Sequence, residues 1–125
     1  MAEYSSEGAV RIADDVVAVI AGLAATKTKG IAGMSGGITE GWAKRVSGKN
    51  VTRGVSVEVG QVETAIDLRV IVDYGVKIHE VSRELQQNVK EAVETMTGLS
   101  VVEVNVKVEG VGFKEEHVDL DRLVK

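Results

Sequence analysis

The sequence contains no cysteine, and only four of its 125 residues are aromatic. Without cysteine, disulfides and thiolate metal sites are excluded, and a reducing intracellular compartment is compatible with the composition. Only two histidines, His79 and His117, remain as typical ligands for a transition metal. We therefore expect no metal site, and no residue pattern points to a cofactor.

Basic charge and long hydrophobic runs are also missing. The net charge of −4 does not favour general nucleic-acid binding or direct attraction to anionic lipid. The longest apolar run, near Val16 to Ala25, is too short and too interrupted to span a bilayer. The first seven residues are acidic and polar, unlike a signal peptide. We expect a cytoplasmic protein without direct membrane insertion, which would reach a membrane only through a partner.

The sequence also lacks a recognisable catalytic pattern. No serine or threonine stands in a visible arrangement with a histidine and an acid, as nucleophilic catalysis requires. The glycine-rich stretch from Gly30 to Gly37 is not followed by the lysine of a phosphate-binding P-loop. His79, one position from an apolar helix residue, is interpreted as a surface or boundary histidine. We expect no enzyme and no catalytic residues.

The strongest positive signal runs from Asp73 to Gly110. A helix of about 22 residues is predicted between Gly75 and Gly98 because apolar residues recur there at steps of three and four. Gly98 suits the left-handed position after a helix. The period then changes to two, which predicts a half-buried strand. The expected helix stripe is Ile78, Val81, Leu85, Val89, Ala92 and Met96, and the expected inner strand residues are Val102, Val104, Val106 and Val108.

Weaker patterns predict the other elements. Gly8 to Ile12 alternates weakly, as a short strand does. Asp14 is a plausible N-cap for a helix through Ala25, with Val16, Val19, Ile20 and Leu23 as its buried stripe. Two strands, Arg53 to Val59 and Val62 to Val72, read as a hairpin. A short helix with Trp42 is predicted over Ile38 to Ser47.

Together these elements predict an α+β fold with two layers. A small mixed β-sheet of three to four strands would be covered by a long C-terminal helix and an N-terminal helix. We expect a disordered N-terminus over residues 1–7, a single domain over residues 8–113, and a charged C-terminal tail over residues 114–125. Because the other side of such a sheet is uncovered, self-association through a sheet edge is a further hypothesis.

The glycine stretch is the candidate interaction loop. Its first four residues, Gly30-Ile-Ala-Gly33, match the GXXG of KH domains, which clamp a nucleic-acid backbone. The candidate interaction residues are Lys27, Lys29, Gly30, Gly33 and Met34. A KH-like RNA-binding protein is therefore the alternative hypothesis, although the acidic net charge and a fourth predicted strand weigh against it.

Six short motifs, in order, resemble the alkaline shock protein and general-stress family of mainly Gram-positive bacteria. They cover about residues 8–113: Gly8-Ala-Val-Arg-Ile12, Gly30-Ile-Ala-Gly-Met34, Arg53-Gly-Val-Ser-Val57, Asp73-Tyr-Gly-Val-Lys-Ile78, Met96-Thr-Gly98 and Val104-Asn-Val-Lys-Val-Glu-Gly-Val111. The resemblance implies a non-enzymatic cytoplasmic scaffold or regulator of cell-envelope stress and homeostasis. It further implies protein partners, either a membrane-anchored protein or, in a short branch of the family, acetyl-CoA carboxylase and fatty-acid synthesis.

Overall fold

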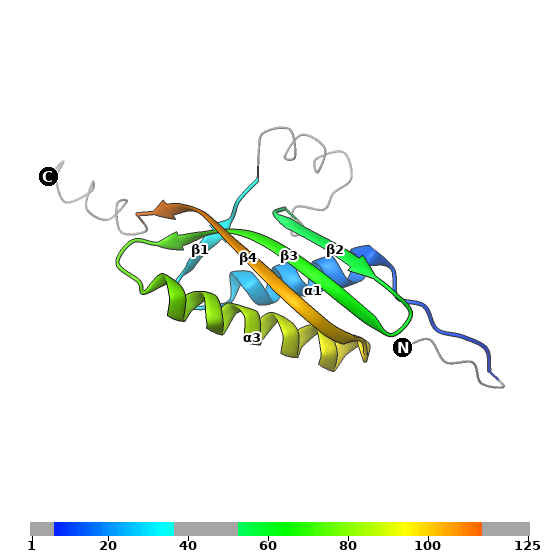
Figure 1. Cartoon of the computed structure of the whole chain (residues 1–125). Helices are drawn as coiled ribbons and strands as arrows, with labels where there is room; N and C mark the ends of the chain where they lie inside the picture. Colours follow the sequence, from blue (N-terminus) through cyan, green and yellow to red (C-terminus); the bar gives the residue numbers. More distant parts are fainter. Residues whose placement is uncertain (1–6, 37–52, 114–125) are drawn as a thin grey trace, which may run out of the picture.

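The computed structural model describes residues 7–36 and 53–113. These ranges form two helices and four strands: α1 (Asp14–Thr26), β1 (Ile31–Met34), β2 (Val55–Val59), β3 (Glu63–Asp73), α3 (Ile78–Thr97) and β4 (Ser100–Gly112). Figure 1 labels each of them. The predicted helix over Ile38 to Ser47, the C-terminal tail and all but the last residue of the predicted disordered N-terminus lie outside the described residues.

Strand β3 organises the sheet. Strand β4 pairs with it in parallel, from Glu63 opposite Ser100 to Asp73 opposite Gly112. The other edge of β3 is shared by two antiparallel partners in succession. Strand β2 pairs with the first half, which confirms the predicted hairpin, and β1 pairs with the second half. The sheet is thus mixed, as the sequence predicts, and its four strands agree with the predicted three to four. The fourth strand is β1, however, and not the predicted strand from Gly8 to Ile12.

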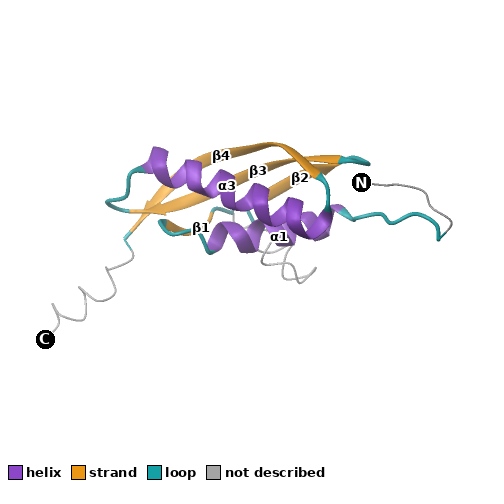
Figure 2. Cartoon of the chain, turned by 90° about the horizontal axis from the view of Figure 1, so that it is seen from below, coloured by secondary structure: helices purple, strands orange, loops and turns teal. Residues whose placement is uncertain are grey.

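Both helices lie on the same side of the sheet, as Figure 2 shows. Buried side chains of α1, α3 and the inner side of β3 form one apolar core, with Ile66, Leu68, Leu85 and Val89 among its least exposed members. The two-layer α+β prediction is confirmed. The long helix is not C-terminal as that prediction stated, because β4 follows it and completes the sheet.

Helix α3 has 20 residues, close to the predicted length, and Gly98 ends it with a left-handed φ of 79°. Its buried residues are Leu85, Val89 and Val93. The predicted stripe was wrong at both ends, since Ile78 and Met96 are exposed. Val93 completes the buried stripe by following Leu85 and Val89 at intervals of four.

Helix α1 occupies the predicted range but presents a different face to the core. Its buried residues are mostly small: Val17, Ala18, Ile20, Ala21, Gly22 and Ala25. Val16 and Leu23, which were expected to be buried, are exposed. Small side chains allow α1 to pack closely, so they occupy the buried face that hydrophobicity alone assigned to larger residues. The N-cap is Ala13 and not Asp14.

Strand β4 departs from simple alternation. Thr64 pairs with Val101, whereas the next residue, Ala65, pairs with Glu103. The extra residue, Val102, forms a β-bulge, which reverses the in–out phase of the strand. Val101 is therefore 5% exposed and Val102 55% exposed, contrary to the prediction that Val102 faces the core. The predicted strand from Gly8 to Ile12 was also wrong, because only Gly8 forms an isolated bridge.

This bulge predicts unequal effects for two neighbouring valines. Val101→Thr places a hydroxyl in the core and should lower the free energy of unfolding by about 1–3 kcal/mol. Val102→Thr alters a solvent-facing side chain and should change it by less than about 0.5 kcal/mol. Urea denaturation of the two variants provides the comparison. Equal losses of stability, or a greater loss for Val102→Thr, would contradict the bulged register.

Candidate protein-interaction surfaces

Half of the glycine-rich stretch forms a strand and not the loop that its composition predicts. Ile31–Met34 form β1, and Ile31 pairs with Val72 while Met34 pairs with Val70. Ile31 is buried and Met34 packs against the core from its edge. Pairing with β3 therefore overrides the conformational freedom of the glycines, because it supplies both backbone hydrogen bonds and apolar contacts.

The two glycines of the GXXG motif serve the fold. Gly30 has a φ of 97°, and a Cβ there would lie 2.7 Å from Cγ2 of Val81 on α3. Gly33 lies inside β1, opposite Ile71. A nucleic-acid clamp of the KH type needs this motif in an exposed loop, so the KH-like alternative loses its structural basis.

The candidate interaction residues do not share one surface. Lys27 is the exposed C-cap of α1, and Lys29 is exposed two residues later. Gly30 is buried, whereas Gly33 and Met34 belong to β1. Lys27 alone lies beside a hollow, namely the groove between the two helices.

That groove separates α1 from α3 on the side away from the sheet. It has a volume of about 470 Å³ and is lined by Ala24, Lys27, Asn88, Glu91, Ala92, Thr95 and Met96. Asn88 Nδ2 donates a hydrogen bond of 3.0 Å to Thr28 Oγ1, which links α3 to the residues that directly follow α1. The groove is open and carries both a cation and an anion, so it resembles an ordinary helix seam more than a ligand site.

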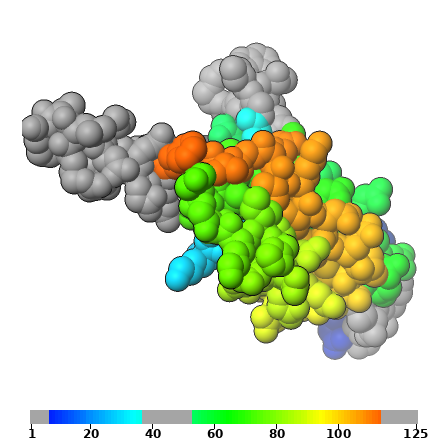
Figure 3. Space-filling view, turned by 60° about the vertical axis from the view of Figure 1, so that its left-hand side comes forward, coloured from blue at the N-terminus to red at the C-terminus, as the bar shows by residue number. Residues whose placement is uncertain are grey.

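Two of the four aromatic residues of the chain meet at one end of the molecule. The Tyr74 and Phe113 rings stack with centroids 5.2 Å apart and an interplanar angle of 30°. Tyr74 follows β3 and Phe113 follows β4, and the Tyr74 N–H donates to the Gly112 carbonyl at 2.8 Å. Figure 3 shows the end of β4, in orange-red, lying against the green residues of β3 and the following turn.

The aromatic pair is exposed although it is apolar. Tyr74 is 70% exposed and Phe113 52% exposed, and Ile78 and Val111 at the same end are also exposed. We call the surface of Tyr74, Ile78, Val111 and Phe113 the aromatic end. Exposed aromatic and aliphatic groups gathered in this way are typical of protein–protein contact sites. The sequence contains a signal for this surface, because both aromatic residues directly follow strands that can be neighbours, but the sequence analysis did not bring them together.

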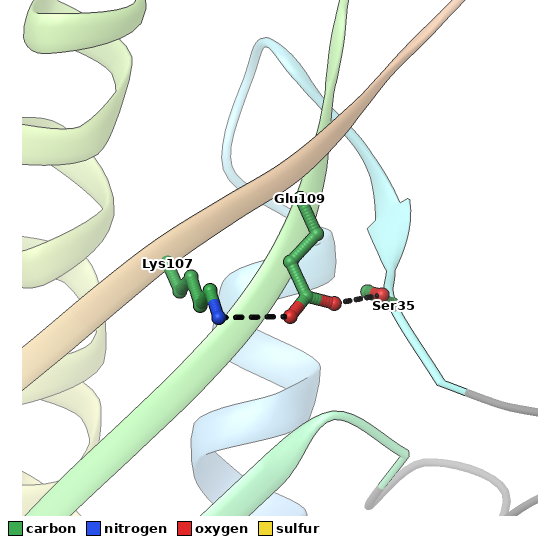
Figure 4. A network of polar contacts seen from close by, with 3 residues as sticks. All are labelled: Ser35, Lys107 and Glu109. Atoms are coloured by element: carbon green, nitrogen blue, oxygen red, sulfur yellow. Dashed lines mark hydrogen bonds and ion pairs between the residues drawn. The ribbon is translucent and has the colours of Figure 1, made fainter.

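The side of the sheet that faces away from both helices is polar, and we call it the open face. Asn105 Nδ2 donates to Asp67 Oδ1 at 2.8 Å across β4 and β3. Glu109 accepts a hydrogen bond of 2.5 Å from Ser35 Oγ and lies 3.8 Å from Lys107 Nζ (Figure 4). The contact with Asp67 joins β4 to its neighbour β3, and the contact with Ser35 joins β4 to the residue that follows β1 on the other side of β3.

The described residues offer few groups for chemistry. Among them, no group of three or more histidine, aspartate or glutamate side chains is placed to hold a metal ion. His79 is exposed, 4.0 Å from Glu80, which agrees with its interpretation as a surface histidine. His117 lies outside these residues. Residues 7–36 and 53–113 include no helix with the length and apolar character needed to cross a membrane.

Comparisons with known proteins place the chain in a family. It is 35% identical to the uncharacterized protein YqhY of Bacillus subtilis, over 91% of this chain and 86% of that protein. It is 39% identical to YloU of the same organism, over 83% and 88%, respectively. It is 36% identical to a stress response regulator gls24 homolog of Streptococcus pyogenes, over 82% of this chain and 58% of the relative.

No solved structure matches the chain significantly. A sequence model of the alkaline shock protein 23 family, described by a cell envelope-related function, matches residues 2–113. This range includes both helices, all four strands and the aromatic end. The chain therefore belongs to this alkaline shock protein family, the Gls24 stress family that the sequence motifs resemble.

Proposed function

We propose that the protein is a non-enzymatic scaffold or regulator of the cell-envelope stress response that binds another protein through the aromatic end. The exposed Tyr74–Phe113 stack is the observation that carries this proposal. Aromatic side chains contribute much of the binding energy at protein interfaces, because they bury a large area at a small cost in conformational entropy.

The position of the stack adds support. It is fixed by the ends of β3 and β4, which pair along their full length, and by the hydrogen bond from Tyr74 to Gly112. A partner would therefore meet rings that are already ordered, so little entropy is lost on binding. Both rings are exposed to solvent in the free protein, and their burial against a partner would be favourable.

Two classes of partner follow from the family resemblance. A membrane-anchored protein would hold the chain close to the envelope from the cytoplasm. Acetyl-CoA carboxylase would instead connect the chain to the control of fatty-acid synthesis. The cell-envelope description of the family and the regulator name of the streptococcal relative favour the first class.

Affinity purification from a native lysate tests the proposal. The variant Tyr74→Ser with Phe113→Ser should lose the partner that the wild-type chain retains, because both rings of the contact are removed. Val62→Ser, an equally exposed apolar residue away from the aromatic end, is the matched control and should retain it. Circular dichroism must show that both variants are folded.

The identity of the retained protein separates the two partner classes. Recovery of a membrane protein supports the anchor, and recovery of carboxylase subunits supports the link to lipid synthesis. Recovery of neither, or equal recovery with the aromatic variant and the wild type, would contradict binding through the aromatic end.

A further inference from the structure

The outer edge of β4 is a second surface suited to binding. Strand β4 pairs with β3 on one side, and within the described residues no strand pairs with its other side. A free edge exposes backbone N–H and C=O groups that can bind another strand. At 13 residues, β4 is also the longest strand described.

Helix α3 covers the first part of this edge. Glu94 Oε2 accepts a hydrogen bond from the Val101 N–H, and Gln86 Nε2 donates to the Val104 carbonyl, both at 2.9 Å. The contact with Gln86 shows that the Val104 carbonyl points away from β3. Because backbone groups alternate between the two edges of a strand, Val106 directs its groups the same way. No described side chain caps Val106 as Gln86 caps Val104.

The uncapped part of the edge lies in a regular segment. The pairing of β4 with β3 shifts between Val101 and Glu103 and again between Val108 and Gly110. Between these bulges, residues 103–108 follow β3 without interruption. A regular segment is the part of a strand that accepts a further partner, because bulges twist the edge away.

The open face of this segment is complementary to itself. Glu103, Asn105 and Lys107 are exposed on it, and their partners on β3 are Ala65, Asp67 and Arg69. Glu103 has no ion pair within the described residues. In an antiparallel pair of two β4 strands centred on Asn105, Glu103 of each copy would lie opposite Lys107 of the other. Val104 would lie opposite Val106, and both direct their backbone groups toward the other copy.

We propose that a second copy of the chain binds here, with β4 antiparallel to β4 about a two-fold axis through Asn105. The dimer would gain two Glu103–Lys107 ion pairs and backbone hydrogen bonds between Val104 and Val106. The bond from Gln86 to Val104 would be exchanged for one of these. Few residues meet in this contact, so the association belongs to the weak, concentration-dependent class. It uses a different surface from the aromatic end and does not depend on it.

Charge reversal tests this register. In the dimer, residue 103 of each copy would face residue 107 of the other. Lys107→Glu therefore puts glutamate against glutamate at both of these pairs, and Glu103→Lys puts lysine against lysine at both. Each variant alone should weaken dimerisation about tenfold, measured by sedimentation of the full chain from micromolar to millimolar concentration. An equal mixture of the two variants should dimerise at least as well as the wild type. In a dimer that contains one chain of each variant, both facing pairs have opposite charges.

Two further variants complete the test. Glu58→Lys reverses a charge on β2, away from the proposed edge, and should leave dimerisation unchanged. Val106→Pro removes an N–H that points away from β3, so it should abolish dimerisation while the fold, checked by circular dichroism, persists. If this variant fails to fold, the charge-reversal set still decides the question.

Five results would overturn the proposal, and four of them concern the full chain. They are a chain that is monomeric at every concentration, a dimer that neither charge reversal weakens, a mixture that associates no better than the single variants, and association that Glu58→Lys disrupts. Dimerisation that appears only after removal of residues 114–125 would also overturn it, because the tail would then occupy the edge in the intact chain.

Discussion

Leu85→Asp is expected to abolish cooperative folding at room temperature. Leu85 is fully buried in the middle of α3, within the core shared by α1, α3 and β3. Aspartate would leave either a charge or an unbonded carboxyl group in this apolar layer, and it would also remove the leucine contacts. The expected loss exceeds about 4 kcal/mol, a large part of the total stability of a domain of this size.

Thermal unfolding followed by circular dichroism measures this effect. Gln87→Asp is the matched control, because it introduces the same side chain at an exposed position of the same helix. The control should unfold cooperatively, close to the wild type. A normal melting transition for Leu85→Asp would show that α3 does not cover the sheet in the way described.

Gly54→Ala is expected to lower the free energy of unfolding by about 2–4 kcal/mol, the second largest effect. Gly54 lies where β1 and β2 meet on the edge of β3, and its φ is 74°. A Cβ there would lie 2.5 Å from the Ser35 carbonyl oxygen and 2.8 Å from that of Arg69. Both are backbone atoms, and the Arg69 carbonyl is held in place because it accepts a hydrogen bond from the Ser35 N–H.

The destabilisation by Gly54→Ala has two causes, namely the positive φ and the clash of the added Cβ with backbone oxygens. Gly75→Ala separates them, because only the first applies there. Its φ is 96°, but a Cβ there would meet nothing within 4 Å, so the substitution should cost only about 1 kcal/mol for the backbone conformation. The difference between the two variants, measured by urea denaturation, isolates the steric clash at the junction of β1 and β2. Equal losses would mean that this junction is looser than the structure shows.

Periodic patterns predicted the parts of the fold that depend on one element at a time. Helix α3 and the strands β2 and β3 have side-chain periods that follow directly from local geometry. The C-terminal glycine of α3 was predicted for the same reason, because only its own φ decides its role. Val93 and Met96 were misassigned because the orientation of a helix at its ends depends on what it packs against.

Features that require a partner strand could not be found from local patterns. The bulge at Val102 exists only in the register between β3 and β4, and a single strand carries no sign of it. Likewise, β1 is short and glycine-rich, so its composition indicates a loop until β3 supplies the pairing. The small residues of α1 were overlooked because close helix packing favours side chains of small volume, whereas a periodicity analysis selects the most hydrophobic side chains.

The candidate site residues also depend on which segments the fold brings together, and not only on local sequence. Lys27, Lys29, Gly30, Gly33 and Met34 are close in sequence, yet the fold assigns them to different surfaces. Tyr74 and Phe113 are 39 positions apart, and they meet because β3 and β4 run parallel and end at the same edge. A parallel pair of strands joined by a helix brings such distant residues together, which only the topology reveals.

Photo-crosslinking inside living cells is the most direct test of binding through the aromatic end. A photoreactive phenylalanine analogue replaces Phe113 in one strain and Val62, exposed elsewhere on the molecule, in another. We expect irradiation to join the chain covalently to another protein at position 113 and to give no such product at position 62. No product at position 113, or the same products at both positions, would contradict the account.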